Sequence, residues 1–230
     1  MRTFLLALAG ILGLATEALA AHPSELCRRA ALGAASAHGI PPAVMLAITD
    51  VETGTTRAGA RGPWPWTLNV AGRGAWFDSR REALTAAEQA LAGGERSFDV
   101  GCFQVNFHWH GHHFDSIGAM LDPDIGADYA ARFLKDLEAE AGDWLVAAGW
   151  YHSRTPVHSN RYRALVARAM ERIGPVEPGT RYATAPEAPE SPVRRVARNT
   201  PAIPLPVTSG GVRLSLFRRT TGALLTRGAP

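Results

Sequence analysis

The sequence predicts a mainly α-helical domain with a small β-hairpin, followed by a tail rich in proline and arginine that is expected to be disordered. Three observations support this fold class. Capping residues and apolar residues at helical spacing recur between residues 23 and 173, aromatic segments flank a glycine-rich turn, and nine of the 16 prolines lie in the last 57 of 230 residues. The expected organisation is a leader over 1–20, a folded domain over 23–173 and a tail over 174–230.

The N-terminal segment has the features of an export signal. Arg2 precedes an apolar core from Phe4 to Leu14, and Ala18-Leu19-Ala20 offers small residues for cleavage. Such a segment is removed on secretion. The alternative is an uncleaved anchor, although the core is shorter than the ~20 residues that span a bilayer. A lipoprotein is disfavoured because Ser24-Glu25-Leu26 precedes Cys27. We therefore expect a periplasmic protein without a stable membrane span.

The chain has two cysteines, Cys27 and Cys102, too few for a disulfide scaffold or a four-cysteine zinc site. Because exported proteins fold in an oxidising compartment, a single pair of cysteines tends to be bridged there. We predict a Cys27–Cys102 disulfide between the first helix and the middle of the domain. Two buried thiols are the alternative.

Helix signals recur along the central region. Ser24 is a candidate N-cap for the first helix and Gly39 ends it, while Ser79 and Glu82 form a capping box before another helix. The spacing predicts helices over residues 24–38, 41–53, 80–92, 125–141, 143–150 and 159–173. Residues 64–70 and 75–77 flank Gly72-Arg73-Gly74, which predicts a β-hairpin.

The tail differs from the domain in charge. Residues 174–230 carry eight arginines and three glutamates, a net charge of 8 − 3 = +5, whereas residues 21–173 carry −2. The overall charge of +3 gives no support for a nucleic-acid-binding function. A solvated tail is the simplest interpretation, with Val212-Leu214-Leu216 as a possible docking strand. The functional alternative is a basic arm that contacts an anionic wall polymer or a protein partner.

Glu52, near the end of the second helix, is the candidate catalytic residue. Ile48 and Val51 place it close to an apolar stripe, so its carboxyl should face the core. Burial raises the pKa of a carboxyl, and a protonated carboxyl can act as a general acid on a glycosidic bond. A solvated glutamate at the helix end is the structural alternative.

Two further segments add polar groups suited to a neutral sugar. Gln104 and Asn106 lie in the apolar Gly101–Asn106 segment, and their amides can hydrogen-bond sugar hydroxyl or N-acetyl groups. Tyr151 and His152 end the helix that contains Ala147. Tryptophans are frequent around the candidate site, either for stacking on sugars or as core residues.

These segments resemble the family 1 lytic transglycosylases, which contain the soluble lytic transglycosylase (SLT) domain. Glu52-Thr53-Gly54 resembles their Glu-Ser-Gly signature. Gly101-Cys102-Phe103-Gln104-Val105-Asn106 is similar to their Gly-Leu/Cys-Met-Gln-Ile-Asn segment, and Ala147–His152 to their Ala-x-x-x-Tyr-Asn segment. The three motifs occur in family order over about residues 27–170. The Pro-Trp-Pro-Trp-Thr-Leu-Asn stretch resembles the corresponding stretch in an exported bacterial subgroup of the family. Some members of that subgroup are associated with flagella or secretion systems.

The resemblance implies a lysozyme-like fold and peptidoglycan glycan strands as substrate. It implies cleavage of the β-1,4 bond between N-acetylmuramic acid and N-acetylglucosamine, with a 1,6-anhydromuramoyl end as product. Glu52 would protonate the leaving oxygen and then accept the proton of the muramoyl 6-hydroxyl as that oxygen attacks C1. Gln104 and Asn106 would hold the sugar or the glutamate, and Tyr151 would hydrogen-bond near Glu52. No cofactor is implied.

Three positions depart from the family pattern. Thr53 replaces the usual serine and keeps the hydroxyl, Phe103 replaces methionine or leucine in the expected groove wall, and His152 replaces asparagine and so bears on the pH optimum. Asp50 is expected to point about 200° around the helix from Glu52, away from the chemistry.

The histidine cluster His108–His113 allows a metal-binding interpretation, because His-x-His-x-His-His tracts can hold zinc. We favour no metal and a loop beside the groove, with Trp109 contacting substrate. Two other functions stay open. A hydrolytic muramidase would need a second carboxylate, with Asp78 or Asp99 as candidates, and a non-catalytic wall-binding assembly subunit would act through its tail.

Overall fold

The computed structural model describes residues 22–57 and 59–177, which form a mainly helical body with two small antiparallel sheets. The expected signal segment and nearly all of the expected tail lie outside these residues. Within the described residues, no helix has both the length and the apolar character needed to cross a membrane. The mainly helical body with small antiparallel sheets confirms the coarse fold class predicted from the sequence.

The described residues contain six longer helices: α1 (Ser24–His38), α2 (Pro42–Thr53), α3 (Arg80–Ala92), α6 (Pro123–Ala141), α7 (Trp144–His152) and α8 (Pro156–Ile173). Three single turns connect the sheet to α6, namely α4 (Phe107–His110), the 3₁₀ turn η1 (Gly111–His113) and α5 (Ile117–Met120). These short turns were not predicted from the sequence, because they are too brief to show helical periodicity.

Capping residues explain most helix ends, and one N-cap predicted from the sequence is wrong. Ser79 and Asp143 each accept a hydrogen bond from a backbone N–H of the first turn, as predicted. Ser24 was wrong as an N-cap: Pro23 holds that position, and the Ser24 hydroxyl lies 2.6 Å from Nδ1 of His22. Helix α8 begins at Pro156 rather than at residue 159, since proline suits a first helical turn.

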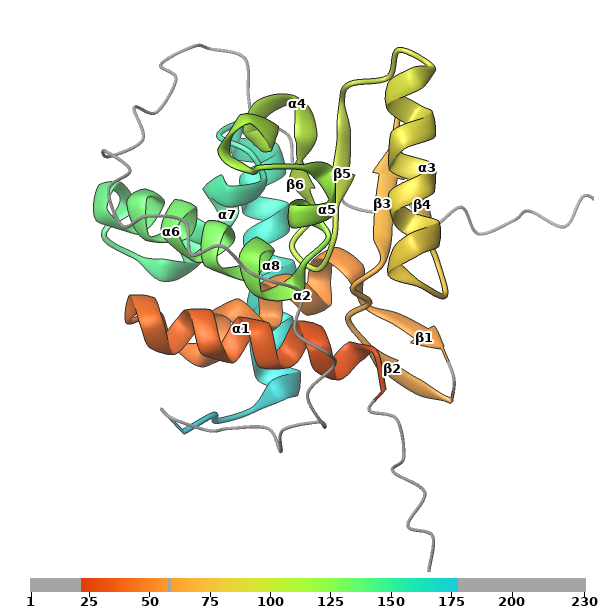
Figure 1. Cartoon of the computed structure of the whole chain (residues 1–230). Helices are drawn as coiled ribbons and strands as arrows, with labels where there is room; N and C mark the ends of the chain where they lie inside the picture. The colour runs from red at the N-terminus through yellow and green to blue at the C-terminus, as the bar shows by residue number, and fades with distance from the viewer. Residues whose placement is uncertain (1–21, 58, 178–230) are drawn as a thin grey trace, which may run out of the picture.

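Helix α2 is the central helix of the body. Eight of its 12 residues are buried, and α1 and α8 pack against it, with α6 beside α1 and α7 beside α8 (Figure 1). Val44 and Ile48 in its apolar stripe are therefore buried, and Val51 is partly buried against the core. This position makes the end of α2 the point where the helical body meets the sheets.

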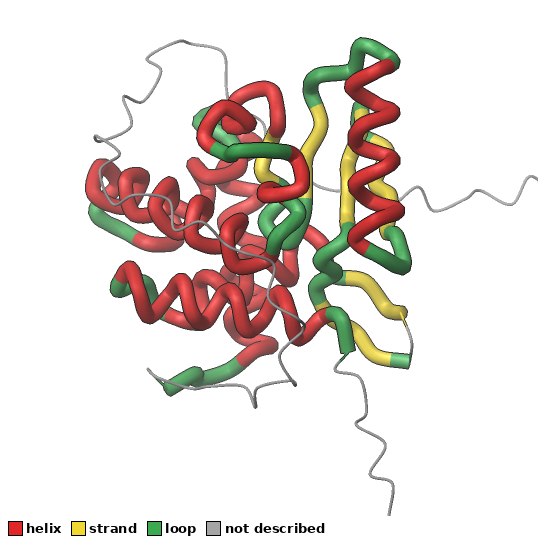
Figure 2. The backbone as a smooth tube through the Cα atoms, viewed as in Figure 1, coloured by secondary structure: helices red, strands yellow, loops and turns green. Residues whose placement is uncertain are grey.

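The larger sheet has the strand order β4-β3-β5-β6, and all its pairs are antiparallel. Its strands are β3 (Thr67–Val70), β4 (Arg73–Trp76), β5 (Phe98–Val100) and β6 (Val105–Asn106), and α3 packs against β3 (Figure 2). The β3–β4 hairpin confirms the predicted one. Strands β1 (Thr55–Arg57) and β2 (Ala60–Gly62) form a second hairpin directly after α2, which was not predicted.

The packed part of the chain extends past the boundary expected at residue 173. Val176 is partly buried and packs against the hydrophobic core. The contacts of the core therefore reach three residues past that boundary, to Val176.

Candidate functional site

Glu52 lies in the last turn of α2 with its side chain in the protein interior. The residue is 1% exposed, whereas the neighbouring Asp50 faces outward and pairs with Arg61 and Arg172. The helix ends immediately after, at Gly54, where a Cβ would lie 2.2 Å from the carbonyl oxygen of Asp50. A residue with a side chain would therefore force the α2–β1 connection away from the end of the helix.

One oxygen of the Glu52 carboxyl is held and the other has no protein partner. The hydroxyl of Tyr162, from α8, donates a 2.6 Å hydrogen bond to Oε1. Within the described part of the chain, Oε2 has no hydrogen-bond partner although it is buried. Since buried polar atoms are nearly always hydrogen-bonded, Oε2 is the atom of this carboxyl that is available to a ligand.

The surroundings of Glu52 favour its protonated form. Burial raises the pKa of Glu52 well above the usual value, the hydrogen bond from Tyr162 opposes this rise, and the charge of Asp99 adds to it. The pKa values of Tyr162 and Tyr151 are raised well above their usual range, first by burial and then by the charge of Glu52. Both phenols are thus neutral hydrogen-bond donors at neutral pH.

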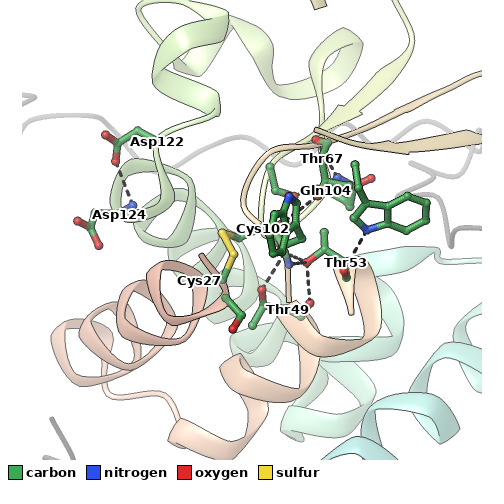
Figure 3. Close-up of a disulfide and its surroundings, with 12 residues drawn as sticks. Cys27, Thr49, Thr53, Thr67, Cys102, Gln104, Asp122 and Asp124 are labelled. Atoms are coloured by element: carbon green, nitrogen blue, oxygen red, sulfur yellow. Dashed lines mark hydrogen bonds between the residues drawn. A yellow bond between two sulfur atoms is a disulfide. The ribbon is translucent and has the colours of Figure 1, made fainter. Parts of the chain in front are cut away.

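Thr53 joins α2 to two loops. Its hydroxyl donates to the carbonyl of Thr49 at 3.1 Å and accepts the backbone N–H of Trp64 at 3.1 Å. The hydroxyl of Thr49 in turn donates to the carbonyl of Cys102 at 2.9 Å (Figure 3). The family resemblance singled out Thr53 because it keeps the hydroxyl of the usual serine. In the structure that hydroxyl belongs to a hydrogen-bond network next to Glu52 in the sequence.

Gln104 and Asn106 are both buried, on the loop before β6 and at its end. Gln104 adopts φ 46°, a left-handed conformation that is uncommon outside glycine, and its Nε2 donates to the carbonyl of Gly101 at 3.0 Å. Its Oε1 has no partner among the described residues. Strained backbone and an unpaired buried amide oxygen occur together at Gln104, a combination typical of functional sites.

Asn106 has a different environment from Gln104. Its Oδ1 accepts the backbone N–H groups of His108 and Trp109 and so caps α4, while its Nδ2 donates to Asp99 at 2.8 Å. Both ends of this amide are therefore engaged within the protein.

The remaining predicted residues divide between the core and the surface. Tyr151 donates to the carbonyl of Phe103 at 2.9 Å rather than to Glu52, and Phe103 itself is buried. His152 stacks on the ring of Tyr162 with the ring centroids 4.7 Å apart. Trp109 is 42% exposed and meets His108 edge-on.

The predicted disulfide is present. Cys27 on α1 and Cys102 on the loop between β5 and β6 are bridged across 75 residues, and neither cysteine is free (Figure 3). Because Cys102 also accepts the hydrogen bond of Thr49, the bridge holds the segment that carries Gln104 against α1 and α2.

The histidine cluster packs largely on aromatic residues. His110 is buried between Tyr129 and Phe133, with Nδ1 2.7 Å from the Tyr129 hydroxyl, and burial lowers its pKa to about 4. The rings of His112 and His113 lie 3.9 Å apart. Among residues 22–57 and 59–177, no three His, Cys, Asp or Glu side chains are grouped so that they could hold a metal ion.

Sequence reasoning missed Tyr162, although the signal was present. Tyr162, Val166 and Ala169 follow one another at spacings of four and three in the last predicted helix, and all three are fully buried. A tyrosine within an apolar stripe needs a buried partner for its hydroxyl. Glu52 was the buried acceptor already singled out.

Comparison of the chain with models of known protein families, with curated proteins and with solved structures found no match.

Proposed function

We propose that this protein is a peptidoglycan lytic transglycosylase with a lysozyme-like fold that acts on the cell wall in the periplasm. The observation that carries the proposal is the Glu52 carboxyl, which is buried, held through Oε1 by Tyr162 and without a partner at Oε2 among the described residues. The three ordered motifs around Glu52, Gln104 and Tyr151 give the substrate class, since they resemble those of the family 1 lytic transglycosylases.

In the proposed reaction Glu52 takes part in two successive proton transfers. It first gives its proton to the bridging oxygen, as the bond from C1 of N-acetylmuramic acid to that oxygen breaks. The carboxylate then accepts the proton of the muramoyl 6-hydroxyl, whose oxygen bonds to C1 and closes the 1,6-anhydro ring. One carboxyl is sufficient because the nucleophile belongs to the substrate, and Glu52 ends in the form in which it began.

The polar groups around Glu52 fit this role. Tyr162 keeps one carboxyl oxygen in place, which leaves Oε2 as the proton-transfer atom. The unpartnered Oε1 of Gln104 can accept a hydrogen bond from a sugar hydroxyl or amide. Because Glu52 is almost fully covered, the glycan reaches it only when neighbouring side chains move apart.

The decisive experiment is digestion of purified sacculi followed by mass spectrometry of the released fragments. The proposal predicts anhydromuramoyl ends from the wild-type protein and none from Glu52→Gln, which keeps the side-chain shape and an oxygen that can accept from Tyr162. Glu88→Gln, the same change at an exposed position on α3, is the matched control and should release as much as wild type. Release by Glu52→Gln at the wild-type rate would rule out Glu52 as the acid.

A hydrolytic muramidase is the second candidate, and one observation favours it. Hydrolysis at this site would need a second carboxylate to place water. Asp78 is exposed and paired with Arg57, whereas Asp99 is buried and close enough to Glu52 for its charge to raise the Glu52 pKa. This function predicts reducing ends in the same digestion, and a non-catalytic assembly subunit predicts no release.

A further inference from the structure

Helix α8, which packs against α2, carries a row of arginines on its solvent side (Figure 1). Arg161, Arg168 and Arg172 are exposed, and their spacings of seven and four residues place them on one face of the helix. Arg161 directly precedes Tyr162, so the two side chains leave the helix about 100° apart. One side of α8 therefore holds Glu52 through the Tyr162 hydroxyl, while another presents positive charge to solvent.

This row has little negative charge near it. Between Asp143 and Glu171 the chain has four arginines and no aspartate or glutamate. In the described part of the chain, no carboxylate lies within 4.0 Å of the guanidinium group of Arg161 or Arg168. That part as a whole carries 15 basic and 18 acidic side chains, a net charge of 15 − 18 = −3. The row is thus a local excess of positive charge on a negatively charged body.

The row continues to the end of α2. Arg172 and Arg61, which is on β2, both donate to Oδ2 of Asp50, at 2.8 Å and 3.2 Å. At Gly54 a Cβ would lie 2.8 Å from Nη1 of Arg61, so this guanidinium group covers the residue that follows α2. Two guanidinium groups on one carboxylate leave a net positive charge in the helix turn that contains Glu52. We call these four arginines the basic track: Arg61, Arg161, Arg168 and Arg172.

The spacing of the basic track fits an extended polyanion rather than a single small anion. Arg161 and Arg168 are seven residues apart, which is about 10 Å along the helix axis. An arginine binds a carboxylate through two adjacent N–H donors of its own guanidinium group. Successive arginines of the track would therefore each bind a separate anionic group. The matching partner is a chain that carries carboxylates at intervals.

We propose that the basic track binds the carboxylates of the stem peptides on the glycan strand that Glu52 cuts. Stem peptides carry free carboxylates and are attached to the muramic acid residues, whereas the glycan backbone itself is uncharged. Because the track starts at the end of α2, a strand whose peptides lie along it stays close to the Glu52 carboxyl. The inference rests on the proposed function, since it takes peptidoglycan as the substrate.

The test measures binding to purified sacculi by sedimentation, in full-length chains that all carry Glu52→Gln so that no digestion occurs. Arg161→Gln/Arg168→Gln removes two charges of the track. Arg81→Gln/Arg163→Gln is the matched control, because it removes two other exposed arginines that have no ion pair in the described part of the chain. Arg163 is on α8 as well, about 200° around the helix from Arg161. The basic tail is present in every variant, so differences between variants report the track.

At low salt the track variant should bind sacculi roughly 2- to 30-fold more weakly than the control variant, because exposed ion pairs are individually weak. The difference should shrink at high salt, which screens exposed charges. It should also vanish on sacculi whose carboxylates have been amidated, and on chitin, which is an uncharged glycan. Equal binding of the two variants to untreated sacculi overturns the proposal. A difference that persists after amidation overturns it as well.

Two further outcomes separate this inference from other interpretations. If the track variant loses binding to phosphatidylglycerol vesicles but keeps binding to sacculi, the track faces a lipid surface and the proposal is wrong. If the protein with Glu52 intact releases nothing from sacculi while binding still depends on the track, the proposed function is refuted and the binding surface stands. Release of anhydromuramoyl ends together with equal binding of the two variants would keep the proposed function and overturn the inference.

Discussion

The hydroxyl of Tyr162 donates a 2.6 Å hydrogen bond to Oε1 of Glu52, joining residues 110 positions apart in the sequence. The bond lowers the pKa of Glu52 against the larger effect of burial, which raises it. Removing the donor should therefore raise that pKa further. In Tyr162→Phe we expect the alkaline limb of the pH–rate profile to move to higher pH.

Tyr162→Phe should also slow the reaction. A hydrogen bond to a charged group is worth about 1.5–3 kcal/mol, which corresponds to roughly 10- to 150-fold in rate where the carboxylate form is required. The ring that stacks on His152 is retained, so the fold should persist. Tyr151→Phe is the matched control, because the Tyr151 hydroxyl donates to the Phe103 carbonyl. Loss of that hydroxyl should not move the alkaline limb of the pH–rate profile to higher pH. Equal profiles for wild type and Tyr162→Phe would contradict the assignment.

The raised pKa of Glu52 also has a consequence for stability. A carboxyl whose pKa is higher in the folded than in the unfolded state contributes stability that is fully present below the unfolded pKa. That contribution is lost as pH rises towards the folded pKa, at about 1.4 kcal/mol per unit of difference. Burial is the main cause at Glu52, so Glu52→Gln should match wild type near pH 4 and exceed it near pH 8.

Urea unfolding of the two proteins at pH 4, 6 and 8 checks this prediction. Glu88→Gln should track wild type throughout, because that glutamate is exposed. A Glu52→Gln variant that is less stable than wild type at pH 8 would show that the carboxylate form is the one favoured by the fold.

Local signals were sufficient for the six longer helices of the described residues, apart from some of their ends, but not for the site. Capping at Ser79 and Asp143 depends on neighbouring residues, and both helices begin where these signals placed them. Strands β5 and β6 have only three and two residues, and they exist because β5 pairs with β3 and β6 pairs with β5, which no local pattern records. Glu52 was recognisable from its own helix, whereas the hydrogen bonds from Asn69 and Asn106 to Asp99 depend on strand register across three strands.

We expect the Thr53 hydroxyl to contribute to the stability of the fold. It accepts the backbone N–H of Trp64, so Thr53→Val would leave that buried donor unpaired at a cost of about 1–3 kcal/mol. Thr53→Ser keeps the hydroxyl and should cost less. Thermal unfolding of both variants distinguishes them, since 1 kcal/mol is about 2–4 °C in Tm for a domain of this size. Equal Tm values for the two would exclude the hydrogen bond as the cause.

The disulfide should contribute strongly to stability because it closes a long loop. For the 75-residue separation between Cys27 and Cys102, the chain-entropy relation gives about 4.5 kcal/mol, and measured losses are typically about 2–5 kcal/mol. We expect the Cys27→Ala/Cys102→Ala protein to unfold at lower urea concentration and to be insensitive to dithiothreitol. On reduction, the urea midpoint of the wild-type protein should fall towards that of the double variant. A wild-type midpoint that is unaffected by reduction would contradict this prediction.

Truncation tests where the folded domain ends and what the basic tail does. Val176 packs against the core, so removal of residues 178–230 should leave Tm unchanged, whereas removal of 174–230 should lower stability by roughly 1 kcal/mol through lost apolar burial. If the tail directs the protein to the wall or to a protein partner, the variant lacking residues 178–230 should still release fragments from purified sacculi but should lose its localisation in cells. Loss of release in vitro would instead assign the tail to substrate binding. The two truncations compared side by side separate that outcome from simple unfolding, because only the longer one removes Val176.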